Sequence, residues 1–539
     1  MERSLYLINP RCEFPTYFGG EALEAIGFAP AVLLADLAIA TVAALAPPDF
    51  RVTLCDEGIS PADLDTPAEF VGITGKGSQE SRMIELAREY RRRGKIVIFG
   101  GCYASLSPGR LRAECDILVQ GEIENIAAQL FADLRAGSWQ REYFGGKPDL
   151  GNSPIPRWDL YPHHRAISGM VQTSRGCPFE CEFCDVIQYL GRNQRHKAIA
   201  QVLAELDVLY ELGHRVVFLA DDNLTVYRAR ARELLLAIKN WNDSRPDGRV
   251  SFSTQVSIDC ARDPELLRLC GEAGLVTVFI GIETPNADSL KETKKRQNIG
   301  VDMCERVARF TANGILVTAG MMVGFDSDTR DIFQAQYDFA MSLPIPMFTI
   351  TPLNAPMATP LHARMLAENR LVDASGEAPM GFPWTTNLVP LQMSRADLMA
   401  GVRWLCNRLF RPAAFEYRLS RFIELYRPPQ IAASGHQGSA PVRLVDVERA
   451  ELSRRVAWLG LREEAMCARI RRRLETNPTA GPLVLLALGY YMQARYIFQQ
   501  SGLWDPSLGE QPAPAFAQPG RSPVTLSDPI TVTESPICQ

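Results

Sequence analysis

The 539-residue sequence has few histidines and no excess of basic residues. Only six histidines occur, and none precedes His163, so the first part of the chain has no imidazole to offer a metal. Lysine and arginine number 57 against 62 acidic residues, which gives a formal net charge of −5. A chain without a net positive field carries no charge signature for nucleic acid, and we expect no nucleic-acid partner.

The sequence also lacks a long hydrophobic run and a secretory start. Its most apolar window, 26–47, contains Asp36 and leads into the strand-like RVTLC, which predicts a buried helix of an α/β unit and not a membrane span. The start, MERSLYLINP, has no basic region followed by an apolar core. We expect a cytoplasmic protein without a transmembrane segment. The shorter stretch 483–492 predicts a core helix, with docking to a partner or membrane face as the alternative.

Thirteen cysteines in a chain without a secretory signal do not indicate a disulfide framework, because the cytosol keeps thiols reduced. Metal binding is the more useful hypothesis. Ten of them share no short spacing: Cys12, Cys55, Cys102, Cys115, Cys260, Cys270, Cys304, Cys406, Cys467 and Cys538.

Short β-rich runs alternate with helical stretches through the first 140 residues. The runs lie at 5–9, 51–55, 70–74, 95–101 and 116–122. Such alternation predicts a parallel sheet covered by helices on both faces, and five units fit a doubly wound, flavodoxin-like domain over 1–144. The Gly- and Pro-rich stretch 145–164 predicts a linker.

A second alternating series follows the linker. Its β-rich runs lie at 169–174, 215–220, 250–256, 276–283, 315–325 and 348–353. Six β/α units predict a partial (β/α)6 barrel over 165–355, with the working residues at the C-terminal ends of the strands. Residues 356–503 predict a mainly helical region. The Pro-rich, aperiodic stretch 504–539 predicts a disordered tail.

Three cysteines stand at CxxxCxxC spacing in SRGCPFECEFCD, directly after the first strand of the predicted barrel. They are Cys177, Cys181 and Cys184. Three thiolates on one loop can bind three irons of a 4Fe–4S cluster and leave the fourth iron open, as in catalytic metal sites. Zinc, with His163 or His164 as a fourth ligand, and a chance spacing are the alternatives.

This motif, its position and the six β/α units resemble the radical S-adenosylmethionine (SAM) superfamily over about residues 165–355. In that family the open iron chelates SAM, and cleavage of SAM yields a radical that takes a hydrogen atom from an unactivated carbon. The resemblance implies that Phe183 contacts the adenine, that Asp221 and Asp222 contact the methionine amino group, and that Glu283 contacts the ribose. Weaker candidates are Gln255, Ser257, Met322 and Phe325. Core packing or helix capping is the alternative role for all of them.

The segments FVGITGKGSQ, KIVIFGGCYASLSP and DILVQGEIE resemble cobalamin-binding domains that precede radical SAM cores, over about residues 1–140. The usual DxHxxG motif is missing, and CDEGIS stands in its place, so we expect cobalamin without a histidine ligand on its lower face. Lys76, Ser78 or Gln79 could approach that face, with a solvated loop as the alternative. The implied cobalamin contacts are Gly72, Thr74, Lys76, Ser78, Gly100, Gly101, Gly121 and Glu122.

Together these resemblances imply a cobalamin-dependent radical SAM methyltransferase that acts on an unactivated carbon of a small molecule: a lipid, a pigment or a natural-product scaffold. An electron donor such as a flavodoxin or ferredoxin would be its partner. The helical region loosely resembles the C-terminal extension of hopanoid methylases. The alternatives are rearrangement or cyclisation without methyl transfer, and a non-catalytic Fe–S or cobalamin carrier. No catalytic residue is assigned, and the basic runs 88–95 and 291–297 are expected to be solvated.

Overall fold

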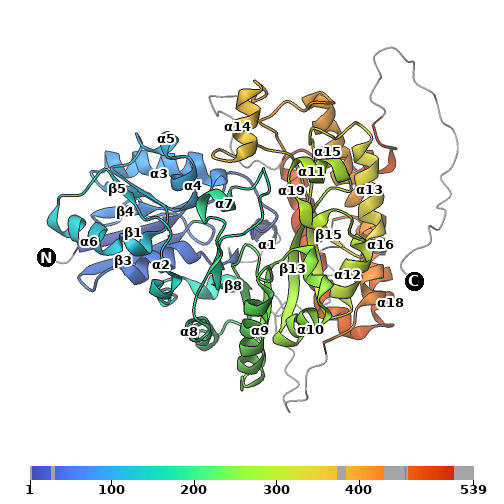
Figure 1. Cartoon of the computed structure of the whole chain (residues 1–539), viewed down its shortest axis with the longest axis horizontal. Helices are drawn as coiled ribbons and strands as arrows, with labels where there is room; N and C mark the ends of the chain where they lie inside the picture. The colour runs from blue at the N-terminus through green and yellow to red at the C-terminus, as the bar shows by residue number, and fades with distance from the viewer. Residues whose placement is uncertain (1–2, 26–30, 373–383, 430–455, 457–458, 515–539) are drawn as a thin grey trace.

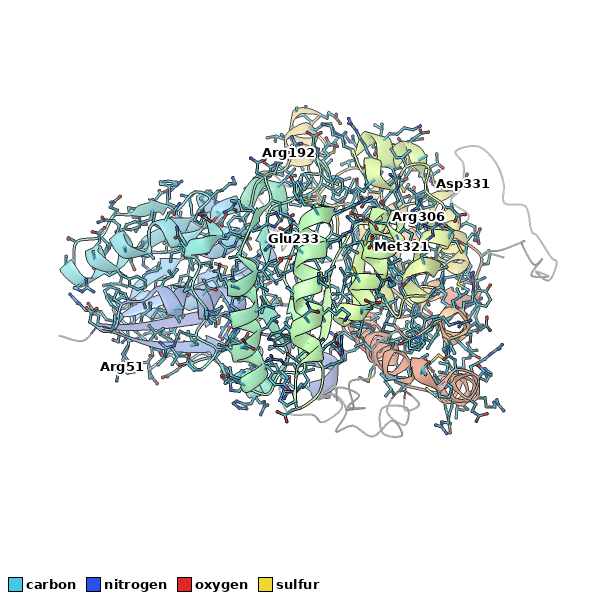
Figure 2. All side chains as sticks on the ribbon, turned by 60° about the horizontal axis from the view of Figure 1, so that its bottom comes forward. Arg51, Arg192, Glu233, Arg306, Met321 and Asp331 are labelled. Atoms are coloured by element: carbon cyan, nitrogen blue, oxygen red, sulfur yellow. The ribbon has the colours of Figure 1, made fainter. Side chains whose placement is uncertain are left out.

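The computed structural model describes residues 3–25, 31–372, 384–429, 456 and 459–514. Figure 1 shows a first α/β part in blue, a second in green, and orange and red helices at the opposite end of the molecule. Charged side chains such as Arg51, Arg192 and Glu233 lie on the outside (Figure 2), whereas Met321 lies in a strand and is fully buried.

The first part contains a six-stranded parallel sheet. In spatial order its strands are β3 (Phe50–Asp56), β1 (Arg3–Asn9), β4 (Phe70–Ile73), β5 (Ile96–Phe99), β6 (Ile117–Gln120) and β7 (Glu142–Phe144). Counted along the chain, the first five follow the flavodoxin-like order 2-1-3-4-5, which confirms the predicted doubly wound fold. All four residues of β4 are buried, as expected for a central strand covered on both faces.

The helices of this part are amphipathic. In α3 (Glu80–Arg92), Met83, Leu86 and Tyr90 face the core, while Arg91 and Arg92 are exposed at the end of the helix. The basic run 88–95 is therefore largely solvated, as predicted. The other helices in this stretch of the chain are α1 (Glu21–Ala25), α2 (Leu37–Leu45), α4 (Gly101–Leu106), α5 (Pro108–Leu111) and α6 (Ala127–Ala136).

The second part is a seven-stranded parallel sheet that forms the partial barrel, and all six predicted strands are present in chain order. From one edge to the other the strands are β15 (Met347–Pro352), β14 (Leu316–Val323), β13 (Leu275–Glu283), β12 (Ser251–Gln255), β11 (Val216–Leu219), β8 (Ala166–Val171) and β2 (Val32–Leu34). The helices between them include α8 (Ile199–Glu211), α9 (Arg228–Asp243), α10 (Pro264–Ala273), α12 (Met303–Thr311) and α13 (Ile332–Ser342).

Strand β2 was not predicted, and its position corrects the single helix expected over 26–47. It pairs in parallel with β8, with Val32 opposite Ala166, so a segment from the first part of the chain forms the edge of the second sheet. Among the described residues of this window, 31–47, the helix is confined to Leu37–Leu45, and Asp36 caps it by accepting a hydrogen bond of 2.9 Å from the N–H of Ile39. Residues 26–30 lie outside the described residues.

The stretch 145–164, predicted as a linker, packs tightly between the two parts. Trp158 and Tyr161 are almost fully buried. The Tyr161 hydroxyl donates a hydrogen bond of 2.7 Å to Asp56 at the end of β3, and the N–H of Arg157 donates one of 3.0 Å to the carbonyl of Ala40. The two aromatic side chains explain why this stretch is tightly packed, because aromatic residues bury large apolar areas.

The C-terminal region is helical, as predicted. Its helices are α14 (Pro360–Ala367), α15 (Arg395–Leu409), α16 (Pro412–Leu425), α18 (Leu461–Leu474) and α19 (Gly481–Gln500). The interior of α19 is buried at Leu483, Leu488 and Tyr491, so the stretch 483–492 is a core helix and not a docking surface. None of the helices in the described ranges is both long and apolar enough to span a membrane.

The start of the predicted disordered tail is ordered, which corrects the expectation for 504–514. The Trp404 indole N–H donates to the carbonyl of Gln511 at 3.0 Å, and the N–H of Asp505 donates to the Asn407 side chain at 2.7 Å. Trp504 also packs under the guanidinium of Arg495, 3.4 Å from its ring centre. Residues 515–539 lie outside the described residues.

The Asp36→Asn variant tests the electrostatics of the β2–α2 junction. Burial, with a further contribution from Asp56, raises the pKa of Asp36 to about 6. The folded protein therefore holds this proton more tightly than the unfolded chain does, and its stability falls as the pH rises from about 4 through 6. Asparagine keeps the cap without the charge. We expect Asp36→Asn to stabilise the ligand-free protein by about 2 kcal/mol at pH 8 and by little at pH 4.

Calorimetric unfolding at the two pH values measures this difference. Asp49→Asn is the control, because Asp49 is exposed and paired with Arg135, which holds its pKa below the ordinary value. A stabilisation from Asp36→Asn that did not depend on pH would contradict the prediction.

Candidate active site

The three predicted cluster cysteines lie on one loop after β8. The loop starts where β9 (Ser174–Arg175) pairs with β10 (Arg195–His196), and the N–H of Cys184 donates to the carbonyl of Cys181 at 3.1 Å, which turns the chain tightly. All three thiols are free. Burial, with a further contribution from Asp185, raises the pKa of the Cys184 thiol to about 12. Thiolates at such a site need a cation, which bound iron would provide.

No three Cys, His, Asp or Glu side chains within the described residues lie close enough to share one metal ion. Ligands of a single tetrahedral zinc stand only about 3.8 Å apart, given Zn–S bonds of about 2.3 Å. Thiolates that bind separate irons of a cubane are spaced more widely. The cluster role of Cys177, Cys181 and Cys184 stays a prediction.

The two predicted carboxylates after β11 have different surroundings. Asp221 is fully buried and accepts hydrogen bonds from the backbone N–H groups of Thr173 (2.8 Å) and Ser174 (2.7 Å). Its carboxylate therefore holds the start of the cysteine loop instead of facing a cofactor. Asp222 accepts a hydrogen bond of 3.2 Å from the N–H of Gly176, and burial raises its pKa to about 6. Asp222 is the better candidate for a cationic amino group.

Glu283, the predicted ribose contact, ends β13 in a left-handed conformation with a φ of 69°. Its carboxylate accepts a hydrogen bond of 2.8 Å from the ammonium of Lys295, and only 8% of its side chain is exposed. Gly281 makes this pair possible. A Cβ at Gly281 would fall 2.8 Å from Lys295 Nζ and closer still to the Glu283 carboxylate.

Lys295 and Gln297 are site residues that the sequence did not reveal. They belong to the basic run 291–297, which was expected to be solvated, and for Lys295 that expectation is wrong because its side chain is only 13% exposed. Although burial lowers it, Glu283 and the thiols of Cys181 and Cys184 raise the pKa of Lys295 above its ordinary value. Gln297 Nε2 lies 4.0 Å from Cys181 Sγ. Both polar groups thus approach the predicted cluster.

The remaining SAM candidates are divided between this site and the protein interior. Phe183 and Met322 are half-buried and pack against one apolar core, and the Lys295 ammonium lies 5.9 Å from the centre of the Phe183 ring. The Ser257 hydroxyl is engaged by Asn223 (3.1 Å) and Asp259, so its role is local. Gln255 is half-buried at the end of β12.

A cavity of about 970 Å³ lies at the C-terminal edge of the first sheet, between it and the barrel. Its lining is more apolar than polar, and no described lining residue is a histidine. Gly101, with a φ of 89°, turns the chain there next to Thr74. A wide apolar space edged by glycines fits a large flat cofactor such as cobalamin. All eight predicted cobalamin contacts line it: Gly72, Thr74, Lys76, Ser78, Gly100, Gly101, Gly121 and Glu122.

Glu122 lines the cavity but uses its carboxylate to join the two parts. It accepts from Arg175 at 2.6 Å and from Arg195 at 2.5 and 3.0 Å, and only 2% of its side chain is exposed. Arg175 also pairs with Glu124 at 2.8 Å. Arg175 directly precedes the cysteine loop and itself lines the cavity. In the sequence, the role of Arg175 was indicated only by its position directly before Gly176 and Cys177.

Comparison with known proteins places these features in a family. Residues 171–340 match the model of the Radical SAM superfamily, and residues 359–465 match a domain of unknown function (DUF4070). An uncharacterized methyltransferase of Synechocystis is 38% identical over 372 residues, which cover 67% of this chain and 68% of the relative. The hopanoid C-2 methylase of Rhodopseudomonas palustris is 33% identical over 353 residues, 63% of this chain and 66% of the relative.

The fold also matches a solved structure. The radical SAM methyltransferase TsrM from Kitasatospora setae, with cobalamin and a [4Fe–4S] cluster bound, aligns with a TM-score of 0.56 at 18% identity and covers 88% of this chain and all of TsrM. The half-barrel with its CxxxCxxC loop and the family match define a radical SAM enzyme, and the doubly wound domain in front of it belongs to the fold shared with the cobalamin-bound TsrM structure. The match to the Synechocystis methyltransferase shows, within that class, that the chain belongs to the radical SAM methyltransferase family.

Replacing Lys295 with methionine tests its place in the SAM site. The change leaves the Glu283 carboxylate buried without its cation and removes a positive charge from beside the cysteines. Hydrogen bonds to charged groups contribute about 1.5–3 kcal/mol, so we expect SAM to bind the reconstituted protein at least about tenfold more weakly. Equilibrium dialysis measures this affinity. Lys294→Met, at the exposed neighbour, is the matched control, and an equal loss in both variants would contradict the assignment.

The absence of histidine from the described cavity lining predicts a spectroscopic result. With cobalamin bound and reduced to the cobalt(II) state, we expect no superhyperfine splitting from a protein imidazole in the electron paramagnetic resonance (EPR) spectrum. The measurement is made on protein with natural-abundance and with ¹⁵N-labelled histidine. A splitting that changed with the label would show that a histidine binds the cobalt.

Proposed function

We propose that this chain transfers a methyl group to an unactivated carbon of a small, largely apolar molecule. One observation carries the proposal: the cysteine loop continues directly into the wall of the cavity. Cys184 is followed by Asp185 and α7 (Val186–Tyr189), and Tyr189 and Leu190 line the cavity. The predicted cluster loop and the cavity proposed for cobalamin therefore share a wall, which supports one active centre for both cofactors.

The residues of the chain have separable tasks in this proposal. Cys177, Cys181 and Cys184 would hold the cluster, and the glycine-edged cavity would hold cobalamin. When bound, the cluster with SAM supplies radical chemistry, and cobalamin supplies a carrier for the methyl group. The Glu283–Lys295 pair fixes a carboxylate at the end of β13, where a ribose could be held. The cavity has a lining that is more apolar than polar, which would disfavour water where reactive species need protection.

The nature of the substrate is the finer part of the proposal. The hopanoid C-2 methylase is named for an apolar polycyclic lipid, and the match covers 66% of that relative. A hopanoid-like lipid is therefore the first substrate to test, with a pigment or natural-product scaffold next. A flavodoxin or ferredoxin is the proposed electron donor.

Methyl-labelled SAM tests the proposal. The full-length protein is reconstituted anaerobically with iron, sulfide and cobalamin, reduced, and incubated with labelled SAM and a hopanoid. We expect 5′-deoxyadenosine to form and label to appear in the lipid. Cys181→Ala should lose most of its iron and at least about a hundredfold in 5′-deoxyadenosine, because one thiolate ligand is missing.

The two alternative functions, rearrangement without methyl transfer and non-catalytic cofactor carriage, predict different results in the same experiment. A rearrangement enzyme would consume a substrate and form 5′-deoxyadenosine without placing label in the product. A non-catalytic carrier would bind the cofactors but would not cleave SAM under reducing conditions. Either result would reject methyl transfer.

A further inference from the structure

Helix α14 of the C-terminal region contacts the cysteine loop directly. Thr359 caps the helix, and the N–H of Leu361 donates a hydrogen bond of 3.1 Å to the carbonyl of Glu182. Arg364, one turn later, donates to both carboxylate oxygens of Glu182, from Nε at 2.8 Å and from Nη2 at 3.1 Å. Glu182 stands between Cys181 and Phe183 in the sequence, so α14 contacts the loop at the predicted cluster and adenine residues.

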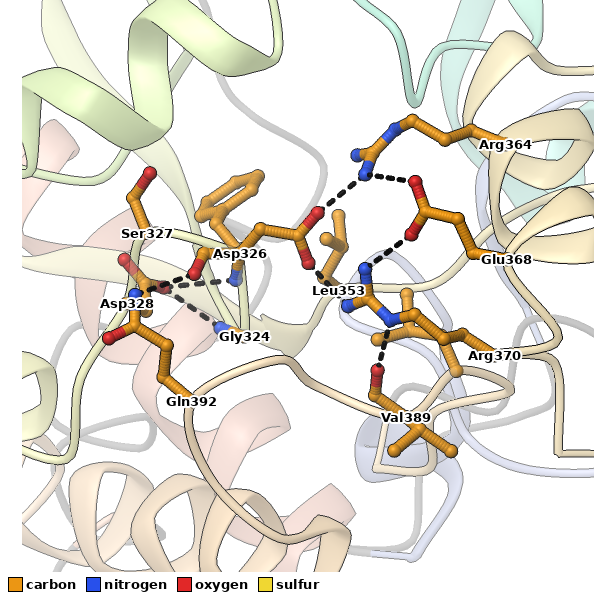
Figure 3. Close-up of polar contacts among 12 residues, drawn as sticks. Gly324, Asp326, Ser327, Asp328, Leu353, Arg364, Glu368, Arg370, Val389 and Gln392 are labelled. Atoms are coloured by element: carbon orange, nitrogen blue, oxygen red, sulfur yellow. Dashed lines mark hydrogen bonds and ion pairs between the residues drawn. The ribbon is translucent and has the colours of Figure 1, made fainter.

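Arg364 also reaches the end of a barrel strand. Its Nη1 pairs with Asp326, which follows β14 by three residues, and Arg370 pairs with the other oxygen of the same carboxylate (Figure 3). Although burial opposes them, Arg370 and Arg364 hold the pKa of Asp326 below its ordinary value. The N–H of Asp326 donates in turn to Glu292 at 2.8 Å, on the segment that leads to Lys295. Arg364 therefore joins the cysteine loop to the barrel rim.

Beneath these ion pairs lies a small apolar core that the C-terminal region shares with the barrel. Its buried members are Phe325, Leu353, Ala355, Leu361, Met365 and Leu388. Phe183 and Met322, both predicted SAM contacts, pack against this core. The rings of Phe183 and Phe325 are 6.4 Å apart. A shift of α14 would thus displace residues at the predicted adenosine side of the site, through the shared apolar packing as well as through the ion pairs.

We infer that Arg364 is a positioning residue through which the C-terminal region sets the geometry of the cysteine loop and so the affinity for SAM. This inference rests on the proposed function of the loop. Arg364 is suited to the task because its planar guanidinium binds Glu182 through two parallel hydrogen bonds and still has a donor for Asp326. The side chains of Glu182 and Asp326 are only 11% and 19% exposed, so water compensates poorly for a lost partner.

Arg364→Met and Arg370→Met form a matched pair of variants. Both remove a guanidinium from residues 359–372 and both deprive Asp326 of a partner, but the described hydrogen bonds of Arg370 go to Asp326, Glu368 and Val389. The full-length proteins are reconstituted anaerobically, and their iron content, SAM dissociation constant and EPR spectrum of the reduced cluster, with and without SAM, are measured. We expect Arg364→Met to weaken SAM binding about tenfold and to alter the SAM-dependent EPR change. Arg370→Met should change the affinity less than about twofold.

Two further variants separate positioning from general support of the fold. Arg364→Lys keeps the charge but cannot bind Glu182 through two parallel bonds, so its affinity for SAM should lie between those of the wild type and Arg364→Met. Glu182→Gln tests the same contact from the loop side without removing the side chain. The double variant Glu182→Gln/Arg364→Met should bind SAM no more weakly than Arg364→Met alone. In the double variant Glu182→Gln/Arg370→Met, the effects of the two changes on the affinity for SAM should add.

Equal losses of SAM affinity in Arg364→Met and Arg370→Met, or additive effects of Glu182→Gln and Arg364→Met, would overturn the inference. If Arg364→Met did not fold, the Glu182→Gln protein with an unchanged affinity for SAM would also overturn it. A wild-type protein that bound no iron–sulfur cluster would instead reject the proposed function. The wild-type control therefore separates the two failures.

Discussion

The cysteine loop is held from three sides by charged groups whose carboxylates are largely buried, and the rest of the site depends on this restraint. Arg175 at its start pairs with Glu122 and Glu124 of the first domain. Asp221 of the barrel fixes the backbone before it. Arg364 of the C-terminal region holds Glu182 near its end. Each contact comes from a different part of the chain, so the loop has its shape only when all three parts are assembled. A buried ion pair that loses one member leaves a costly unpaired charge, which opposes any partial arrangement.

The sequence was sufficient to predict most of the fold and the local motifs of the site. Alternating β-rich and helical runs identified eleven strands, because buried parallel strands are short, apolar and regularly spaced. The cysteine triplet and the strand-end glycines were found because each is a compact pattern whose chemistry depends on spacing alone. The cavity then brought together eight predicted residues from three segments of the first domain.

The missed features depend on contacts between distant segments. Lys295 stands in KETKKRQ, where nothing local separates a buried lysine from its solvated neighbours, and only Glu283 and the glycine at 281 make a place for it. Asp221 and Glu122 occupy positions at strand ends where ligands are expected, but arginine and backbone partners from other segments engage their carboxylates. Strand β2 was missed because three apolar residues before a capped helix are too few to show a period.

Strand β2 also has a consequence for the architecture of the chain. The polypeptide starts in the first sheet at β1, contributes Val32–Leu34 to the edge of the second sheet, and returns to the first at β3. The two parts are therefore not consecutive, independent domains, because a segment from the first part of the chain belongs to the second sheet. A fragment cut at the apparent boundary would remove the partner of β8 and leave the backbone groups of that strand open to adventitious pairing. Exchanging the first part of this chain as a whole module would remove the edge strand of the second sheet.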